Sequence, residues 1–145
     1  MNSQLLSRLL VTAQMALLVA VAIPDRHLHT QPAGATLVAL GVALGLWAML
    51  VMGRHLRIMP EPAADAKLLR RGPYRLVRHP MYSAVVLAAT GWLLCDFSWP
   101  RLACLAALLP VLAFKAAREE RMLGEKFSDY AAYRASTRRF VPWVW

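Results

Sequence analysis

Charged residues are missing from long stretches of this chain. Residues 5–23 hold a single charge, that of Arg8, and residues 33–53 hold none. Each stretch has the roughly 20 apolar residues that a helix needs to cross the hydrocarbon core of a bilayer. Of all residues, 59% are apolar, against roughly 45–50% in soluble domains, so the composition excludes an ordinary soluble domain.

A third stretch, residues 81–114, has only two charged residues, Asp96 and Arg101. At a rise of about 1.5 Å per residue, one straight helix of this length would overshoot the membrane. The segment from Asp96 to Pro100 has turn chemistry, which predicts a tight hairpin of two helices, about residues 80–95 and 101–117. The predicted fold is an all-α polytopic membrane protein with four transmembrane helices, the last two in this hairpin, followed by a C-terminal amphipathic cytoplasmic helix.

Cysteine and clustered metal ligands are also scarce. The two cysteines, Cys95 and Cys104, flank the predicted turn without CxxC spacing. We interpret them as small buried apolar residues in preference to a disulfide. His27 and His29 have no cysteine or carboxylate beside them, so the sequence predicts no metal site.

Acidic residues are outnumbered by basic ones, 8 against 17, which gives a net charge of +9. With four helices, every basic residue except Arg26 and Arg101 falls on one side of the membrane. This asymmetry follows the positive-inside rule and predicts that both termini are cytoplasmic, in a bacterial inner membrane or its equivalent. Anionic lipid headgroups are then the partners of the positive charge, and nucleic acid is not. Ala20-Val21-Ala22 resembles a signal-peptide cleavage site, but we expect an uncleaved helix.

The polar loop before the hairpin carries an unusual pattern. Gly72-Pro73 predicts a turn, and His79-Pro80 lies where the third membrane helix must begin. The free N–H groups at a helix start form an anion site, and Arg78 adds positive charge beside it. A headgroup-facing basic loop would explain the arginines but not the glycine, prolines and aromatic residues between them.

The segment from residue 115 onward has apolar residues at helical spacing, with Glu119 and Glu120 among them. Carboxylates at a membrane boundary are costly unless cations or hydroxyl groups meet them. Ion pairing with basic residues one helical turn away explains them equally well. The residues alone leave both interpretations open.

Together the two polar segments resemble the isoprenylcysteine carboxyl methyltransferase family, which belongs with the phospholipid N-methyltransferases. The family pattern is G-x-Y-x-x-x-R-H-P-x-Y, a helical hairpin, E-E, a Phe, Y-x-x-Y and R-x-x-P. Two departures are Ser128-Asp129, where many relatives have Gly and one more residue, and Lys115, where many carry Arg. The matching positions are Gly72, Tyr74, Arg78, His79, Pro80, Tyr82, Glu119, Glu120, Phe127, Tyr130, Tyr133, Arg139 and Pro142.

The resemblance divides a single membrane domain, residues 1–145, into two N-terminal transmembrane helices, residues 1–60, and a catalytic half, residues 66–142. It implies binding of S-adenosylmethionine, with S-adenosylhomocysteine as product, and methyl transfer to a lipid-like or isoprenylcysteine-like acceptor. Glu120 would accept hydrogen bonds from the cofactor's ribose or amino group, and Lys115 and Glu119 would face the acceptor. The implied lining of the cofactor pocket is Leu69, Tyr74, His79, Pro80, Met81 and Tyr82.

Two other functions stay open at this point. Membrane sterol reductases are similar to this family in their C-terminal half and bind NADPH there, but they are much longer. A non-enzymatic membrane adaptor is the other alternative, because Gly41-x-x-x-Gly45 is a packing motif that suits a homodimer or packing within the chain. The sequence does not distinguish O-, N- and S-methylation.

Overall fold

The computed structural model describes residues 3–23, 31–53 and 68–141, and it contains no strand within them. The elements are α1 (Ser3–Ala22), α2 (Pro32–Met52), a 3-10 helix η2 (Gly72–Arg75), α3 (Pro80–Cys95), α4 (Trp99–Lys126) and α5 (Tyr130–Ser136). The predicted all-α class is therefore confirmed. Arg26, His27, His29 and Pro142, named above, lie outside the described ranges, as do the basic residues Arg54, Arg57 and Lys67.

Three of the described helices, α1, α2 and α4, are long and apolar enough to cross a membrane. Their outward faces expose large apolar side chains such as Leu50, which is 80% exposed, and Phe114, which is 70% exposed. Helices that are apolar on all sides belong in a lipid environment. The predicted third span, α3, is apolar but only 16 residues long. The chain is thus an integral membrane protein by the length and composition of its helices.

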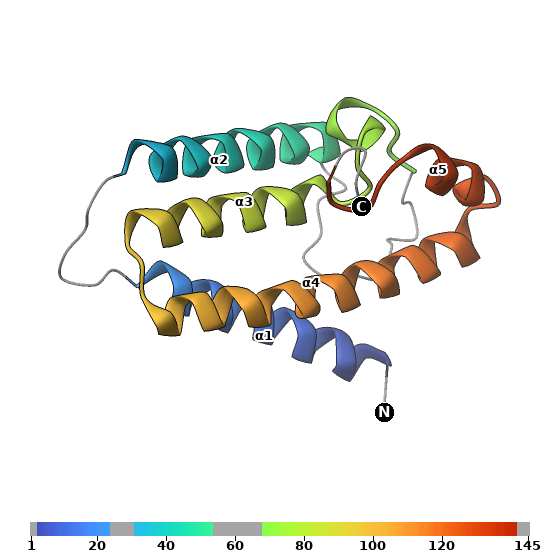
Figure 1. The fold of residues 1–145 in the computed structure, drawn as a ribbon. Coiled ribbons are helices and arrows are strands. Elements are labelled where there is room, and N and C mark those ends of the chain that lie inside the picture. Colours follow the sequence, from blue (N-terminus) through green and yellow to red (C-terminus); the bar gives the residue numbers. More distant parts are fainter. Residues whose placement is uncertain (1–2, 24–30, 54–67, 142–145) are drawn as a thin grey trace.

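The helices form two layers, with α2 lying along α3 and α1 lying along α4 (Figure 1). Glycines bring α2 and α3 into close contact. A Cβ atom at Gly41 would lie 2.7 Å from the backbone nitrogen of Ala88, and one at Gly91 would lie 2.6 Å from the backbone oxygen of Gly34. Gly45 also faces α3, at Ala84. Packing within the chain therefore occupies this face, and a homodimer through Gly41 and Gly45 stays an untested prediction.

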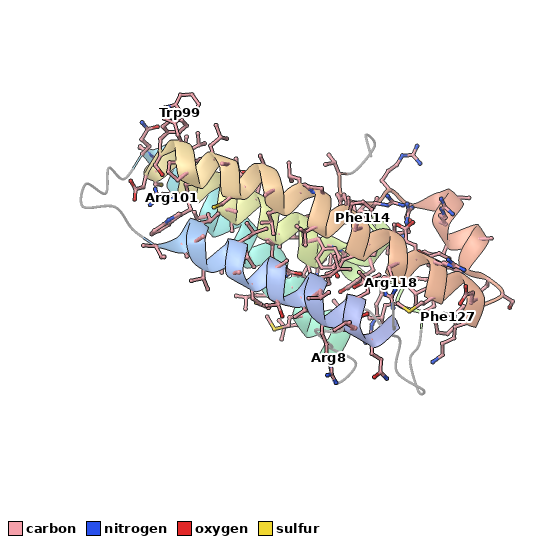
Figure 2. The ribbon with its side chains drawn as sticks, turned by 90° about the horizontal axis from the view of Figure 1, so that it is seen from below. Arg8, Trp99, Arg101, Phe114, Arg118 and Phe127 are labelled. Atoms are coloured by element: carbon pink, nitrogen blue, oxygen red, sulfur yellow. The ribbon has the colours of Figure 1, made fainter. Side chains whose placement is uncertain are left out.

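The turn between α3 and α4 is stabilised by a buried ion pair. Arg101 Nη1 lies 3.0 Å from Asp96 Oδ2, and Arg101 Nη2 donates to the carbonyl oxygen of Ile23 at 2.6 Å. The pair thus joins the end of α1 to the hairpin, at the end of the molecule where Figure 2 shows Arg101 and Trp99. Cys95 and Cys104 are both free thiols here.

Helix α4 is longer than expected. We expected it to end near residue 117 and a separate amphipathic helix to follow, but α4 continues to Lys126, and within the described residues the short α5 is the one helix after it. Residues 117–126 are mostly strong helix formers, and the first turn-forming pair is Ser128-Asp129. Glu119 and Glu120 therefore lie on the same continuous helix as the apolar span, just beyond its apolar part.

The chain after α5 returns beside the loop before α3. The backbone N–H of Arg78 donates to the carbonyl oxygen of Arg138 at 2.7 Å, and that of His79 donates to Arg139 at 3.1 Å. The start of α1, η2, the start of α3 and α5 consequently lie at one end of the helices (Figure 1). Figure 2 shows Arg8 and Arg118 toward this end, opposite Arg101. The sidedness of the membrane and the location of the termini stay predictions.

Candidate active site

A cavity of about 420 Å³ lies where the helix layers meet the polar loop. Its volume falls within the roughly 300–1,000 Å³ of small-molecule pockets. It contains eight of the nine site residues expected from sequence, all but Glu120. The residues that line it are Gln14, Met15, Leu18, Met52, Leu68, Leu69, Tyr74, Arg78, His79, Pro80, Met81, Tyr82, Val85, Lys115, Glu119, Leu123 and Tyr133.

His79 precedes α3, and Pro80 occupies the first turn of the helix as predicted. The side chain of Ser83 and the backbone N–H of Ser83 both hydrogen-bond at this end, to Phe140 and His79 respectively, at 2.6 and 3.1 Å. These contacts fix the start of α3 against the returning C-terminal segment. The first turn of α3, which lines the cavity, is therefore held in one position.

His79 lies between the two glutamates of α4. Its Nδ1 is 3.2 Å from Glu119 Oε2, and its Nε2 is 3.3 Å from Glu120 Oε1. Its ring stacks on that of Tyr82, whose hydroxyl donates to Glu119. Burial lowers the pKa of His79, but hydrogen bonds and charges of the two glutamates outweigh it and raise the pKa above its usual value. Residues some 40 positions apart thus form one polar cluster.

Glu120 is also held by two arginines. Its Oε1 accepts from Arg78 Nε and Arg139 Nε, both at 3.0 Å, and its Oε2 accepts from Arg139 Nη2 at 2.8 Å. Arg78 Nη1 continues to the carbonyl oxygen of Thr137 at 2.5 Å. Glu120 is only 5% exposed and does not line the cavity. These contacts join the loop, α4 and the C-terminal segment, and the expected contact of Glu120 with the cofactor stays a prediction.

Lys115 lines the cavity on the side that faces α1. Its Nζ donates to Gln14 Oε1 at 2.7 Å and lies 5.2 Å from the centre of the Tyr82 ring. The side chains of Gln14, Met15 and Leu18 line the cavity beside it. Sequence reasoning missed them because it treated the first stretch only as an apolar span. The available signal was an amide in the middle of that span.

Two tyrosines complete the wall near α5. Tyr133 donates its hydroxyl to the carbonyl oxygen of Tyr74 at 2.7 Å. Burial raises the pKa of Tyr133 to about 12 and raises that of Tyr74 as well, so both stay neutral at physiological pH. The Tyr74 hydroxyl is buried and makes no hydrogen bond to the described residues. It is therefore an unsatisfied polar group in a residue that lines the cavity.

Comparison with known proteins gives a family match over most of the chain. The family model described as phospholipid methyltransferase matches residues 30–130, from just before α2 to the start of α5. No individual curated protein matches the chain. Because the family match extends over most of the chain, including the loop, the hairpin and both glutamates, this protein belongs to the phospholipid methyltransferase family, within the isoprenylcysteine carboxyl methyltransferase-like group of membrane methyltransferases.

Proposed function

We propose that this protein transfers a methyl group from S-adenosylmethionine to a lipid-like or isoprenylcysteine-like acceptor at the cytoplasmic membrane face. Members of this family generally use S-adenosylmethionine. The observation that carries the proposal is the shared cavity, in which Tyr74, His79 and Tyr82 from the loop and α3 lie opposite Lys115 and Glu119 of α4. Motif residues from two distant segments thus meet in one space that is large enough for a small molecule.

Several groups of the residues that line the cavity suit this cofactor. The start of α3, at Pro80 and Met81, suits the methionyl carboxylate, because helix starts attract anions. The Tyr82 ring and the Glu119 carboxylate suit a sulfonium cation. The buried, unpartnered hydroxyl of Tyr74 suits a polar atom of the cofactor. S-adenosylmethionine supplies the electrophilic methyl group when bound.

The chain's own residues contribute position and a dry environment to the reaction. Tyr82 and His79 fix the Glu119 carboxylate between them, and Lys115 is 2% exposed. When a sulfonium and an anionic acceptor react, both charges disappear, and such a transition state is favoured where water is excluded. Alignment of the two reactants then accounts for the catalysis.

The proposal includes four membrane crossings with both termini cytoplasmic. At a rise of about 1.5 Å per residue, α3 is about 24 Å long, a little short of the roughly 30 Å hydrocarbon core. Local thinning of the bilayer accommodates such a mismatch. In a chain lacking its native cysteines, Arg71→Cys and Ser128→Cys should label from the same side and Phe97→Cys from the other. Labelling of Arg71→Cys and Ser128→Cys from opposite sides would contradict the topology.

Calorimetry with S-adenosylhomocysteine on the purified protein tests the function. We expect binding in the wild type and unchanged binding in the control Glu125→Gln, because Glu125 lies on α4 outside the cavity. Glu119→Gln should weaken the binding of S-adenosylmethionine more than that of S-adenosylhomocysteine, which lacks the sulfonium charge. Incubation of a membrane lipid extract with methyl-labelled cofactor, followed by mass spectrometry, then identifies the acceptor and the methylated atom. Binding of NADPH would instead support a reductase, and binding of neither cofactor would support an adaptor.

A further inference from the structure

Helix α1 contributes to the cavity although it lies outside the family match, which begins at residue 30. Gln14, Met15 and Leu18 line the cavity from this helix, opposite Lys115 of α4. The family match covers the loop, the hairpin and the glutamates, whereas this wall belongs to a part of the chain beyond it. Such a wall is suited to distinguish one acceptor from another.

The Gln14 side chain is buried, with the residue only 7% exposed. Its carboxamide oxygen accepts from Lys115 Nζ at 2.7 Å, and its amide nitrogen donates to none of the described residues. A polar group inside a membrane-spanning helix is expensive unless it meets a partner. Because Lys115 holds the oxygen, the orientation of the carboxamide is fixed, and its N–H groups are directed away from Lys115 while the residue lines the cavity.

Lys115 and Gln14 together are donors of the kind that bind an oxyanion. The ammonium group supplies charge, and the carboxamide supplies neutral N–H groups of fixed direction. The Glu119 side chain nearby accepts from the Tyr82 hydroxyl and contacts His79. Apolar surface adjoins the donors, because Met15, Leu18 and Val85 line the same cavity.

We propose that Gln14 and Lys115 bind an oxyanion group of the acceptor, a carboxylate or a phosphate, while the acceptor's apolar chain lies against Met15 and Leu18. Gln14 is then a specificity-determining residue that the family motif does not include. The identification of this ligand as the methyl acceptor rests on the proposed function. The binding chemistry itself does not, since it depends only on the cavity and its donors.

Simple amphiphiles test the binding chemistry without knowledge of the natural acceptor. Dodecanoate and dodecyl phosphate carry the two oxyanions on the same chain, and dodecanol carries the chain without charge. Acetate and inorganic phosphate carry the charge without the chain. Affinities are measured in a neutral maltoside detergent, without cofactor, from the concentration dependence of the melting temperature. We expect both anionic amphiphiles to bind at least tenfold more tightly than dodecanol, and the chain-free ions to bind far more weakly.

Variants of Gln14 assign this selectivity to the residue. Gln14→Leu should lower the affinity for the anionic amphiphiles about ten- to hundredfold, because one hydrogen bond to a charged group is lost. The affinity for dodecanol should stay unchanged. Gln14→Glu keeps a partner for Lys115 and so preserves the fold, but its carboxylate should repel both anions. Gln4→Leu is the control, because Gln4 lies exposed on the same helix. This control should bind all three amphiphiles as the wild type does.

The alternative outcomes each contradict the proposal. Equal affinity for dodecanol and dodecanoate would show that the wall recognises only a chain. Binding of the chain-free ions as tightly as the amphiphiles would show a free-anion site. Unchanged selectivity in Gln14→Glu would exclude this residue. A weakened S-adenosylhomocysteine affinity in Gln14→Leu, with amphiphile binding intact, would place the amide at the cofactor. Absence of S-adenosylhomocysteine binding in a wild type that still selects anions would refute the methyl-transfer function alone.

Discussion

Removal of the negative charge at Glu120 should destabilise the fold. Glu120→Gln keeps the side-chain shape but replaces one oxygen that accepts hydrogen bonds with an NH₂ group that donates them. In the structure the two carboxylate oxygens of Glu120 face Arg78, Arg139 and His79 at 2.8–3.3 Å. One donor of these cations would then face another donor, and the buried positive charges would lose their counter-charge.

The expected loss is about 3 kcal/mol in the free energy of unfolding. Breaking a buried ion pair from one side costs roughly 3–5 kcal/mol. The lower value applies because the Arg139 side chain is 23% exposed and because Arg78 keeps its contacts with the carbonyl oxygens of Thr137 and Arg134. At about 1.4 kcal/mol per factor of ten, the folded-to-unfolded ratio would fall about a hundredfold.

Unfolding in mixed micelles with increasing dodecyl sulfate measures this loss. Glu125→Gln is the matched control, because it makes the same substitution on the same helix in an exposed pair with Arg121, whose side chains are 66% and 83% exposed. That pair should contribute less than about 0.5 kcal/mol. A loss for Glu120→Gln no larger than that of Glu125→Gln would refute the reasoning from burial and contacts.

The same two variants test whether Glu120 also contacts the cofactor. A direct charge-assisted hydrogen bond predicts about a ten- to hundredfold weaker S-adenosylhomocysteine affinity in Glu120→Gln, measured on folded protein. Glu120 does not line the cavity, and the structure gives it partners within the chain. An unchanged affinity together with lower stability would identify it as a positioning residue for His79 and the two arginines.

Three further perturbations should have equally specific effects. Gly41→Val should cost roughly 1–3 kcal/mol of stability, because its Cβ would meet α3 backbone atoms at 2.7 and 2.8 Å, whereas the exposed Ala43→Val should be nearly neutral in the same unfolding assay. The raised pKa of His79 means that its contribution to stability is complete below about pH 6.5 and is lost as pH rises through the raised value, so the melting temperature should fall toward alkaline pH, and His79→Gln should flatten this profile. Arg101→Met should cost roughly 3–5 kcal/mol, and the double variant with Asp96→Asn should unfold at a higher dodecyl sulfate concentration than the single one.

The hairpin shows how far local sequence determines this fold. The helix predicted over residues 80–95 is confirmed to the residue, because His79-Pro80 and the turn after Cys95 are both local signals. The predicted end of the next helix, near residue 117, is too early, because a change from apolar to charged residues does not by itself end a helix. Lipid exposure changes there, but backbone hydrogen bonding continues while the residues favour a helix.

The two glutamates show what sequence spacing leaves open. Adjacent positions on a helix point in directions about 100° apart, so spacing predicts that Glu119 and Glu120 face different surroundings but not which ones. In the structure, Glu119 lines the cavity and accepts a hydrogen bond from Tyr82. Glu120 instead contacts Arg78 and Arg139. Only the return of the C-terminal segment beside the loop decides this, since it brings Arg139 to Glu120.

Sequence alone determined the membrane class, the helical hairpin and the two motif segments, because apolar length, turn residues and motif spacing are properties of neighbouring positions. The tertiary structure decided that α1 joins the site. Gln14 meets Lys115, 101 positions away, only because α1 packs along α4 and not along α2. Such a pairing depends on the shapes of whole helix faces, which no local pattern in an apolar span records.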